Sequence, residues 1–101
     1  MFINVKKLNS KAKLPERATA TSAGADLCAC IDDDVVLMPG DRKLIPTGLA
    51  IAVPTGYGGF VFARSGLSSK FGVSLANCVG VIDSDYRGEV KISVINHSDE
   101  P

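Results

Sequence analysis

The chain has 101 residues, which is enough for one domain and leaves no room for a second. Lys and Arg together number 11, as do Asp and Glu, so the formal net charge at pH 7 is zero. This balance argues against a partner that is a nucleic acid or an anionic membrane, and it favours a small molecule.

The cysteines are Cys28, Cys30 and Cys78, an odd number with no Cys-x-x-Cys pair, so neither a disulfide framework nor a zinc site is predicted. We expect them to be small buried hydrophobic residues in a reducing compartment. The sequence begins without a cationic segment leading into an apolar core, and no stretch approaches the length of a membrane span. These features predict a cytoplasmic protein that does not bind membranes.

Short apolar runs, cut at intervals by Pro and Gly, predict an all-β sandwich or barrel rather than a helical fold. In chain order, residues 1–8 suit a first strand and residues 9–22 an irregular crossing segment. Residues 27–31 and 35–38 are expected to be strands on either side of a solvated acidic turn. A turn at residues 39–41 then precedes a long buried strand over residues 44–53.

The second half of the chain continues this pattern. Residues 54–59 contain three glycines and predict a hairpin turn, followed by a strand with Phe60 and Phe62 on one face. Residues 65–71 are the one plausible helical turn, with Ser65 as its N-cap and free N–H groups that suit an anion. The last strand alternates Val90, Ile92 and Val94 with polar residues, so one of its faces is wet.

The most informative segment is residues 80–89, which place two acids and an aromatic ring between apolar strands. Asp83 and Asp85 point to opposite sides of an extended backbone, and Tyr86 followed by Gly88 reverses the chain. The turn therefore presents a carboxylate beside a ring. Taken alone, an ordinary acidic hairpin turn explains these residues equally well.

Two upstream segments, Ala23-Gly24-Ala25-Asp26-Leu27 and Arg64-Ser65-Gly66-Leu67, change this balance. With residues 80–89, they resemble in order and spacing the first three signature motifs of the homotrimeric dUTP diphosphatases (dUTPases). The resemblance implies a jelly-roll-like β-sandwich or barrel of the dUTPase type (β-clip). It also implies a homotrimer with sites between subunits that hydrolyses dUTP to dUMP and pyrophosphate with Mg²⁺.

The same resemblance assigns roles to individual residues. It makes Asp83 the carboxylate that orients and deprotonates the attacking water. It places Tyr86 against the deoxyribose, where the ring leaves no room for a 2′-hydroxyl, and Asp26 near Mg²⁺ as an outer-sphere contact. The implied triphosphate contacts are Arg64, Ser65 and Gly66, and the implied uracil contacts are Asn77, Gly80, Val81, Ile82 and the strand around Lys91.

Each of these residues also has an ordinary structural interpretation. Asp83 could cap its turn, Arg64 could close a strand in a surface ion pair, and Asn77 could be a turn residue. Tyr86 could be a rim or core aromatic, and Asp26 could support a neighbouring strand. The lone histidine, His97, is expected in an exposed loop.

Two family motifs have no counterpart here: a fourth, a short strand with an Arg and a Gln, and a fifth, a Gly-rich tail that closes over the substrate. We therefore expect residues 1–101 to form a single dUTPase-like domain that is the N-terminal part of a longer one. Two alternatives stay open. One is a non-catalytic deoxyuridine-nucleotide-binding or regulatory paralogue, and the other is a dCTP deaminase of related fold.

Overall fold

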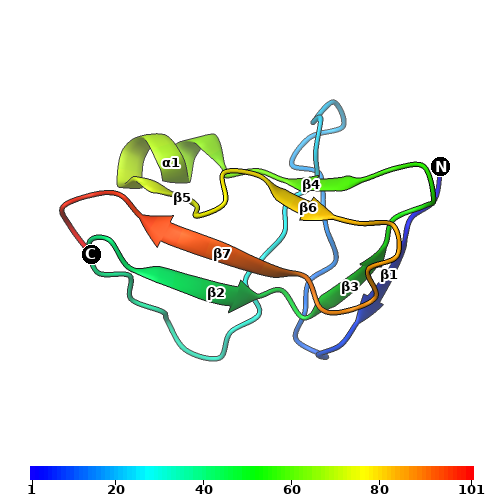
Figure 1. Ribbon diagram of the computed structural model, residues 1–101, viewed down its shortest axis with the longest axis horizontal. Coiled ribbons are helices and arrows are strands. Elements are labelled where there is room, and N and C mark those ends of the chain that lie inside the picture. Colours follow the sequence, from blue (N-terminus) through cyan, green and yellow to red (C-terminus); the bar gives the residue numbers. More distant parts are fainter.

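The computed structural model describes residues 1–101, and short antiparallel strands make up almost all of its regular structure (Figure 1). They form three small sheets with the orders β1–β3, β2–β7–β5 and β4–β6. The prediction of an all-β, jelly-roll-like sandwich is thereby confirmed. In chain order the elements are β1 (Asn4–Lys7), β2 (Arg42–Pro46), β3 (Leu49–Ala52), β4 (Gly59–Val61), α1 (Ser65–Phe71), β5 (Val73–Leu75), β6 (Gly80–Ile82) and β7 (Lys91–Asn96).

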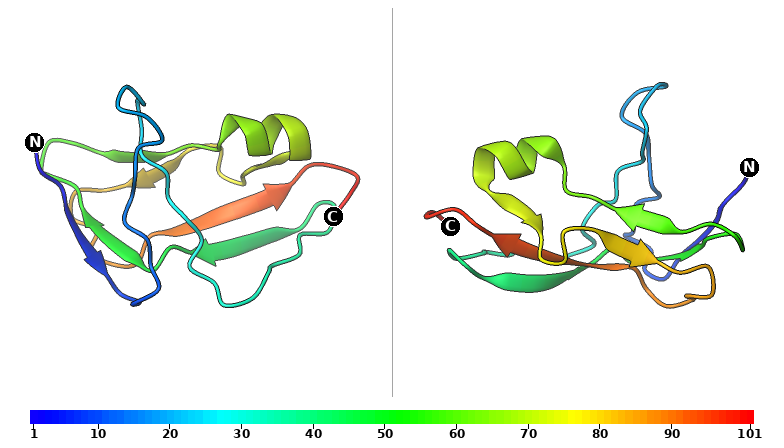
Figure 2. Two further views of the ribbon diagram at one scale, coloured as in Figure 1. Left: turned by 180° about the vertical axis from the view of Figure 1, so that it is seen from behind. Right: turned by 45° about the horizontal axis from the view of Figure 1, so that its top comes forward.

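The core lies where the β4–β6 ladder faces β3 and the start of β7. Val53, Ile82 and Val90 form its buried centre, against which Val61 and Ile92 pack from the two neighbouring layers. Figure 2 shows the same arrangement from behind and tilted, with the β4–β6 ladder apart from the β2–β7–β5 sheet. Only 9 of 101 residues are buried, so this core is small and most apolar side chains keep some contact with water.

The long strand predicted over residues 44–53 is wrong, because the chain changes sheet in the middle of it. β2 pairs with β7 and β3 pairs with β1, and the break falls at Gly48, whose φ is 69°. The backbone of Val90 bonds to residues on both sides of this break. Its carbonyl accepts hydrogen bonds from Thr47 N at 3.2 Å and from Thr47 Oγ1 at 2.6 Å. Its N–H donates to the carbonyl of Leu49 at 2.8 Å. The hydrophobic alternation continues across Gly48, so this pattern could not reveal the change of sheet.

The strands predicted at residues 27–31 and 35–38 do not form. This segment passes beside β2, but a single backbone hydrogen bond joins them, from Cys30 N to Pro46 O at 2.8 Å. Two backbone carbonyls later in this segment accept hydrogen bonds from side chains instead. Lys43 Nζ donates to Val36 O at 2.7 Å, and Asn96 Nδ2 donates to Leu37 O at 2.9 Å. Because these carbonyls bond to side chains rather than to a neighbouring strand, no ladder is built.

The cysteines are not buried as predicted. Cys28 and Cys78 are exposed and Cys30 is half-buried, and all three are free thiols. Cys28 lies on the segment that lacks a strand partner, which leaves it open to solvent. Cys78 stands in a tight turn with a φ of 65°, a conformation that few residues other than glycine adopt.

The two predicted turns in the middle of the chain differ in outcome. The turn at residues 39–41 is confirmed, with Asp41 N donating to Met38 O at 2.9 Å and Gly40 at a φ of 81°. Residues 54–59 also turn, since Tyr57 N donates to Pro54 O at 3.0 Å. They do not make a hairpin, because the strands on either side, β3 and β4, pair with β1 and β6 rather than with each other.

Candidate functional site

The β4–β6 ladder places the third motif at one end and the second motif at the other. Gly59 pairs with Ile82 and Val61 with Gly80, so β6 runs out at Asp83 where β4 begins. Continued past β4, the chain reaches Arg64 beyond the opposite end, beside α1 (Figure 1). The second and third motifs therefore lie beyond opposite ends of this ladder.

A small cavity of about 110 Å³ lies beside β6 and β7. All five residues that the sequence assigned to uracil line it, which means that the fold gathers Asn77, Gly80, Val81, Ile82 and Lys91 from three segments. Cys78 N donates to Leu75 O at 3.1 Å and Val79 N donates to Asn77 O at 2.7 Å; these bonds fold residues 75–79 back towards β6.

Ser93 also lines this cavity and was not among the predicted residues. It lies two residues after Lys91 on β7, and residues two apart in a strand share a face. That period of two was the available signal. A serine adds a hydroxyl that both donates and accepts hydrogen bonds, which suits the edge of a nucleobase.

The turn after β6 is closed by its neighbours rather than by the Asp83 carboxylate. Tyr86 N donates to the carbonyl of Asp83 at 3.1 Å, and Arg87 Nη1 donates to Ser84 O at 2.7 Å. The side chain of Asp83 is exposed and makes no hydrogen bond within the chain. The capping role considered for Asp83 is therefore not observed, and both of its carboxylate oxygens are available.

Tyr86 is fixed in this turn by its hydroxyl, which donates to Glu89 O at 2.7 Å. Tyr86 is 44% exposed and lies at the surface rather than in the core. Gly88 makes room for the ring, because a Cβ at that position would lie 2.7 Å from Tyr86 Oη. The glycine in this motif therefore keeps the ring in place.

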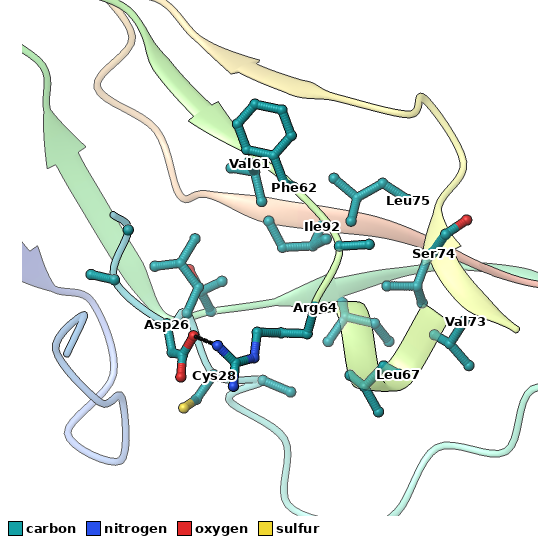
Figure 3. Close-up of a pocket in the computed structure, with 18 of the residues that line it drawn as sticks. Asp26, Cys28, Val61, Phe62, Arg64, Leu67, Val73, Ser74, Leu75 and Ile92 are labelled. Carbon is teal, nitrogen blue, oxygen red and sulfur yellow. Dashed lines mark ion pairs between the residues drawn. The ribbon is translucent and has the colours of Figure 1, made fainter. Parts of the chain in front are cut away.

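Arg64 and Asp26 contact each other: Nη1 of Arg64 lies 3.1 Å from Oδ1 of Asp26 (Figure 3). Asp26 is held by paired backbone hydrogen bonds with Glu16, of 2.8 and 3.4 Å. The side chains are 66% and 40% exposed, so the pair is at the surface. The structure therefore contains the surface ion pair considered for Arg64, with the carboxylate of Asp26 as its partner. Both residues line the mouth of a larger cavity, of about 650 Å³.

Helix α1 forms where predicted, but Ser65 is its first residue and not its cap. Arg64 occupies the N-cap position with extended backbone and no side-chain hydrogen bond to the helix. Ser65 and Gly66 are both exposed. A Cβ at Gly66 would meet nothing within 4 Å, so neither packing nor backbone geometry requires a glycine there. With seven residues, α1 is far too short to cross a membrane, and it is the only helix.

The acidic residues do not gather into a metal centre. No group of three or more His, Cys, Asp or Glu side chains lies close enough together to hold an ion. Asp26 keeps one carboxylate oxygen that is not paired with Arg64, which suits an outer-sphere contact to a hydrated Mg²⁺ better than direct ligation. His97 is exposed, as predicted, with Nε2 3.1 Å from Ser74 Oγ.

Comparison with known proteins places this fold in a family. The dUTPase family model matches residues 10–101. The deoxyuridine 5′-triphosphate nucleotidohydrolase of Syntrophotalea carbinolica is 54% identical over 98 residues, which cover 97% of this chain and 67% of that protein. The enzyme of the same name from Desulfitobacterium hafniense strain DCB-2 is 59% identical over 90 residues, or 88% of this chain and 60% of that protein.

Among solved structures, a mutant dUTPase from phage phi11 of S. aureus, described as coordinating a structural Mg(II) ion, superimposes with a TM-score of 0.87. It is 35% identical, and the match covers 97% of this chain and 61% of that one. The chain belongs to the dUTPase family. It spans between 60 and 67% of the length of these relatives.

Proposed function

We propose that this chain provides the nucleotide site of a dUTP diphosphatase, which hydrolyses dUTP to dUMP and pyrophosphate. The observation that carries the proposal is the position of Asp83. Its carboxylate is exposed and makes no hydrogen bond within the chain, and it directly follows the strand whose residues line the small cavity. A carboxylate that its own turn does not use, beside a pocket, is suited to act on a bound molecule.

The small cavity suits a uracil ring read largely by backbone. β6 pairs only with β4, so the N–H and C=O groups along its other edge have no partner in the chain. A base that meets these groups completes their hydrogen bonds. Cytosine presents a donor where uracil presents an acceptor and leaves a polar group unpaired, a stronger basis for discrimination than shape. Tyr86, fixed through its hydroxyl to Glu89, would lie against the deoxyribose and exclude a 2′-hydroxyl.

In the proposed reaction Asp83 accepts a proton from a water molecule as that water attacks the α-phosphorus. The bond from the α-phosphorus to the oxygen that bridges to the β-phosphorus breaks, and pyrophosphate leaves with that electron pair. The guanidinium of Arg64 would neutralise phosphate charge, with Ser65 and the backbone of Gly66 beside it. Gly66 is compatible with this role, because a Cβ there would meet nothing within 4 Å and its backbone is open to a close approach by a phosphate.

Mg²⁺ would arrive on the triphosphate as part of the substrate. A hydrated Mg²⁺ needs few protein ligands, which agrees with the absence of an acidic cluster. Asp26 would contact a water of that ion through its free oxygen. Binding of the triphosphate would then compete for the guanidinium of Arg64, which is paired with Asp26 in the free chain.

We also propose a homotrimer with sites between subunits, and the ladder geometry supports it. Arg64 follows one end of the β4–β6 ladder and Asp83 follows the other, so a second copy would supply one of the two to a shared site. Residues 1–101 would form one domain of each subunit. We also propose a cytoplasmic location, which the three free thiols favour.

The test is release of pyrophosphate from dUTP, with dCTP and UTP as matched substrates and ammonia measured in parallel. We expect pyrophosphate from dUTP alone, in Mg²⁺-dependent amounts. The assay is run on the 101-residue chain and on the same chain extended with the C-terminal part of a relative. Tight dUTP binding without pyrophosphate in either form would indicate a binding protein, and ammonia from dCTP would indicate a deaminase.

A further inference from the structure

The phenyl ring of Phe60 folds back over Gly58, the residue two positions before it in the chain. A Cβ at Gly58 would lie 3.1 Å from Cζ and 3.3 Å from Cε2 of this ring. The ring therefore occupies the space that a side chain at position 58 would fill. Phe60 is still 60% exposed, so much of the ring keeps contact with solvent. Its tip points along the strand, past the first residue of β4.

This end of the β4–β6 ladder is the end at which Asp83 follows β6. Ile82, the last residue of β6, pairs with the first residue of β4, so Asp83 and Gly58 are the next residues on the two strands. Ile82 is buried, whereas Val81 is 62% exposed. Because successive side chains of a strand point to opposite faces, the carboxylate of Asp83 is expected on the face of Val81. Phe60 is the partner of Val81 and belongs to the same face.

We infer that Phe60 is a positioning residue for Asp83, with its ring as an apolar wall beside the carboxylate. This inference rests on the proposed function, in which Asp83 accepts a proton from the attacking water. Gly58 has no side chain that could bond to the carboxylate, and Asp83 makes no side-chain hydrogen bond elsewhere in the chain. The ring of Phe60 is then the group that limits the directions in which the carboxylate can turn.

The ring also limits the directions from which bulk water can reach the carboxylate. An apolar group on one side of a base excludes water from that side and leaves the other side for the water that reacts. A general base works only when the proton it takes lies within hydrogen-bond reach, and a misplacement of about 1 Å can cost 10²-fold in rate. Phe60 would therefore affect the rate of the chemical step rather than the binding of dUTP.

Two neighbouring positions provide matched comparisons. Phe62 has the same side chain and is 66% exposed, but it lies beyond the other end of β4, away from Asp83. Gly58 does not have a positive φ, so its backbone accepts a larger residue. A side chain there would displace the Phe60 ring without removing it, since the nearest atoms are the tip of that ring.

The test is a double-mutant cycle of Phe60→Ala with Asp83→Asn, read as kcat and KM for dUTP in the form of the protein that releases pyrophosphate. We expect Phe60→Ala to lower kcat about tenfold and to leave KM within about twofold of the wild type. In the Asp83→Asn background the same substitution should change the residual kcat by less than about twofold, because positioning acts only through the carboxylate. Phe62→Ala should have the same effect on kcat in both backgrounds.

Two further variants keep the test decisive. Phe60→Leu retains an apolar side chain and should recover most of the kcat that Phe60→Ala loses. Gly58→Val keeps Phe60 but displaces its ring, so it should lower kcat with little change in KM. Circular dichroism and the thermal midpoint establish that each variant is folded. If Phe60→Ala fails to fold, Gly58→Val takes its place in the cycle with Asp83→Asn.

The outcomes separate a positioning role from a structural one. An equal fall in kcat in the two backgrounds would mean that Phe60 supports the fold or the assembly, and it would overturn the inference. Wild-type kcat in Phe60→Ala, or a raised KM with unchanged kcat, would overturn it as well.

A readout without substrate separates this inference from the proposed function. In an acid titration followed by NMR, the ring resonances of Phe60 should respond to the ionisation of Asp83, and Asp83→Asn should abolish the response. Turnover of dUTP without that response overturns the inference and leaves the proposed function standing. A wild type that releases no pyrophosphate from dUTP removes the proposed function, and the positioning role with it, even where the NMR response shows the ring beside the carboxylate.

Discussion

The guanidinium of Arg64 lies 3.1 Å from the carboxylate of Asp26, so the first and second sequence motifs meet on one surface of the free chain. This contact gives each residue a partner within the chain. Arg64 is 66% and Asp26 40% exposed, and water therefore screens the pair. Little stability is therefore expected to depend on this contact.

We expect Asp26→Asn to lower the free energy of unfolding by less than about 1 kcal/mol, the range for an exposed ion pair. Urea denaturation measures this difference. Asp32→Asn is the control, since it breaks the exposed Lys11–Asp32 pair of 2.7 Å away from the proposed site. A loss of several kcal/mol for Asp26→Asn alone would mean that the pair supports the fold and is not readily released.

Asp83→Asn should lower the turnover of dUTP by roughly 10²–10⁴, the range for loss of a general base, while binding and stability stay close to wild type. Asp83 makes no side-chain hydrogen bond in the chain, so the substitution removes no structural contact. Asp85→Asn, an exposed acid in the same turn, is the matched control. Steady-state kinetics and binding of a non-hydrolysable dUTP analogue, both on the extended chain, are measured. Equal turnover in the two variants would remove Asp83 from the mechanism.

Gly66→Ala should separate stability from nucleotide binding. Alanine is the better helix former by about 1 kcal/mol, and a Cβ at this position meets nothing within 4 Å, so the variant should be slightly more stable. The same methyl group should hinder a phosphate that approaches the backbone and weaken binding of the dUTP analogue. Ser69→Ala in the same helix is the control and should leave binding unchanged. A more stable variant with unchanged binding would contradict the phosphate role.

Tyr86→Ala should reduce discrimination between dUTP and UTP and leave discrimination between dUTP and dCTP close to wild type. The ring is proposed to exclude the 2′-hydroxyl, whereas the strand beside Asn77 is proposed to read the base. Tyr86→Phe keeps the ring and loses only the 2.7 Å hydrogen bond to Glu89 O, so it should cost about 1 kcal/mol of stability and keep the sugar preference. The measurement is the ratio of kcat/KM for dUTP to that for UTP and to that for dCTP. If Tyr86→Ala reduced the dUTP/dCTP ratio instead, Tyr86 would read the base rather than the sugar.

Gly48→Ala should destabilise the fold by roughly 2 kcal/mol or more. The residue has a φ of 69°, and a Cβ would lie 2.9 Å from the Cβ of Ala12 and 3.0 Å from Sγ of Cys30. Gly40→Ala is the control, with a φ of 81° but nothing within 4 Å, and should cost about 1 kcal/mol. Thermal or urea unfolding measures both. A loss for Gly48→Ala no larger than that for Gly40→Ala would show that crowding at the sheet change is unimportant.

Local sequence patterns correctly predicted elements that depend mainly on local residues. The alternation of Ile92 and Val94 with polar residues gave β7, and the turn at Gly40 followed from turn chemistry. The prediction of one strand over residues 44–53 was wrong, because hydrophobic alternation does not reveal that the chain changes sheet at Gly48. Residues 27–31 carry strand-like residues but find no ladder partner, and the pairing of distant segments is not encoded in local propensity.

The sequence predicted which residues belong to the candidate site, and the structure shows which of them lie together. The resemblance of motifs predicted Asn77 and Lys91 as neighbours, and both line the small cavity. It did not predict that Arg64 would pair with Asp26, because an ion pair between two motifs depends on the tertiary arrangement. The catalytic role of Asp83 and the substrate contacts stay predictions.

β7 pairs with β2 on one edge and β5 on the other, and this arrangement governs the order in which the chain can fold during synthesis. As the nascent chain emerges, β1 can pair with β3 and β4 with β6 while β7 is still unmade. The backbone edges of β2 and β5 that pair with β7 stay unpaired until β7 has been synthesised. Pairing across such sequence distances is slow, so we expect the β2–β7–β5 sheet to form after the other two ladders.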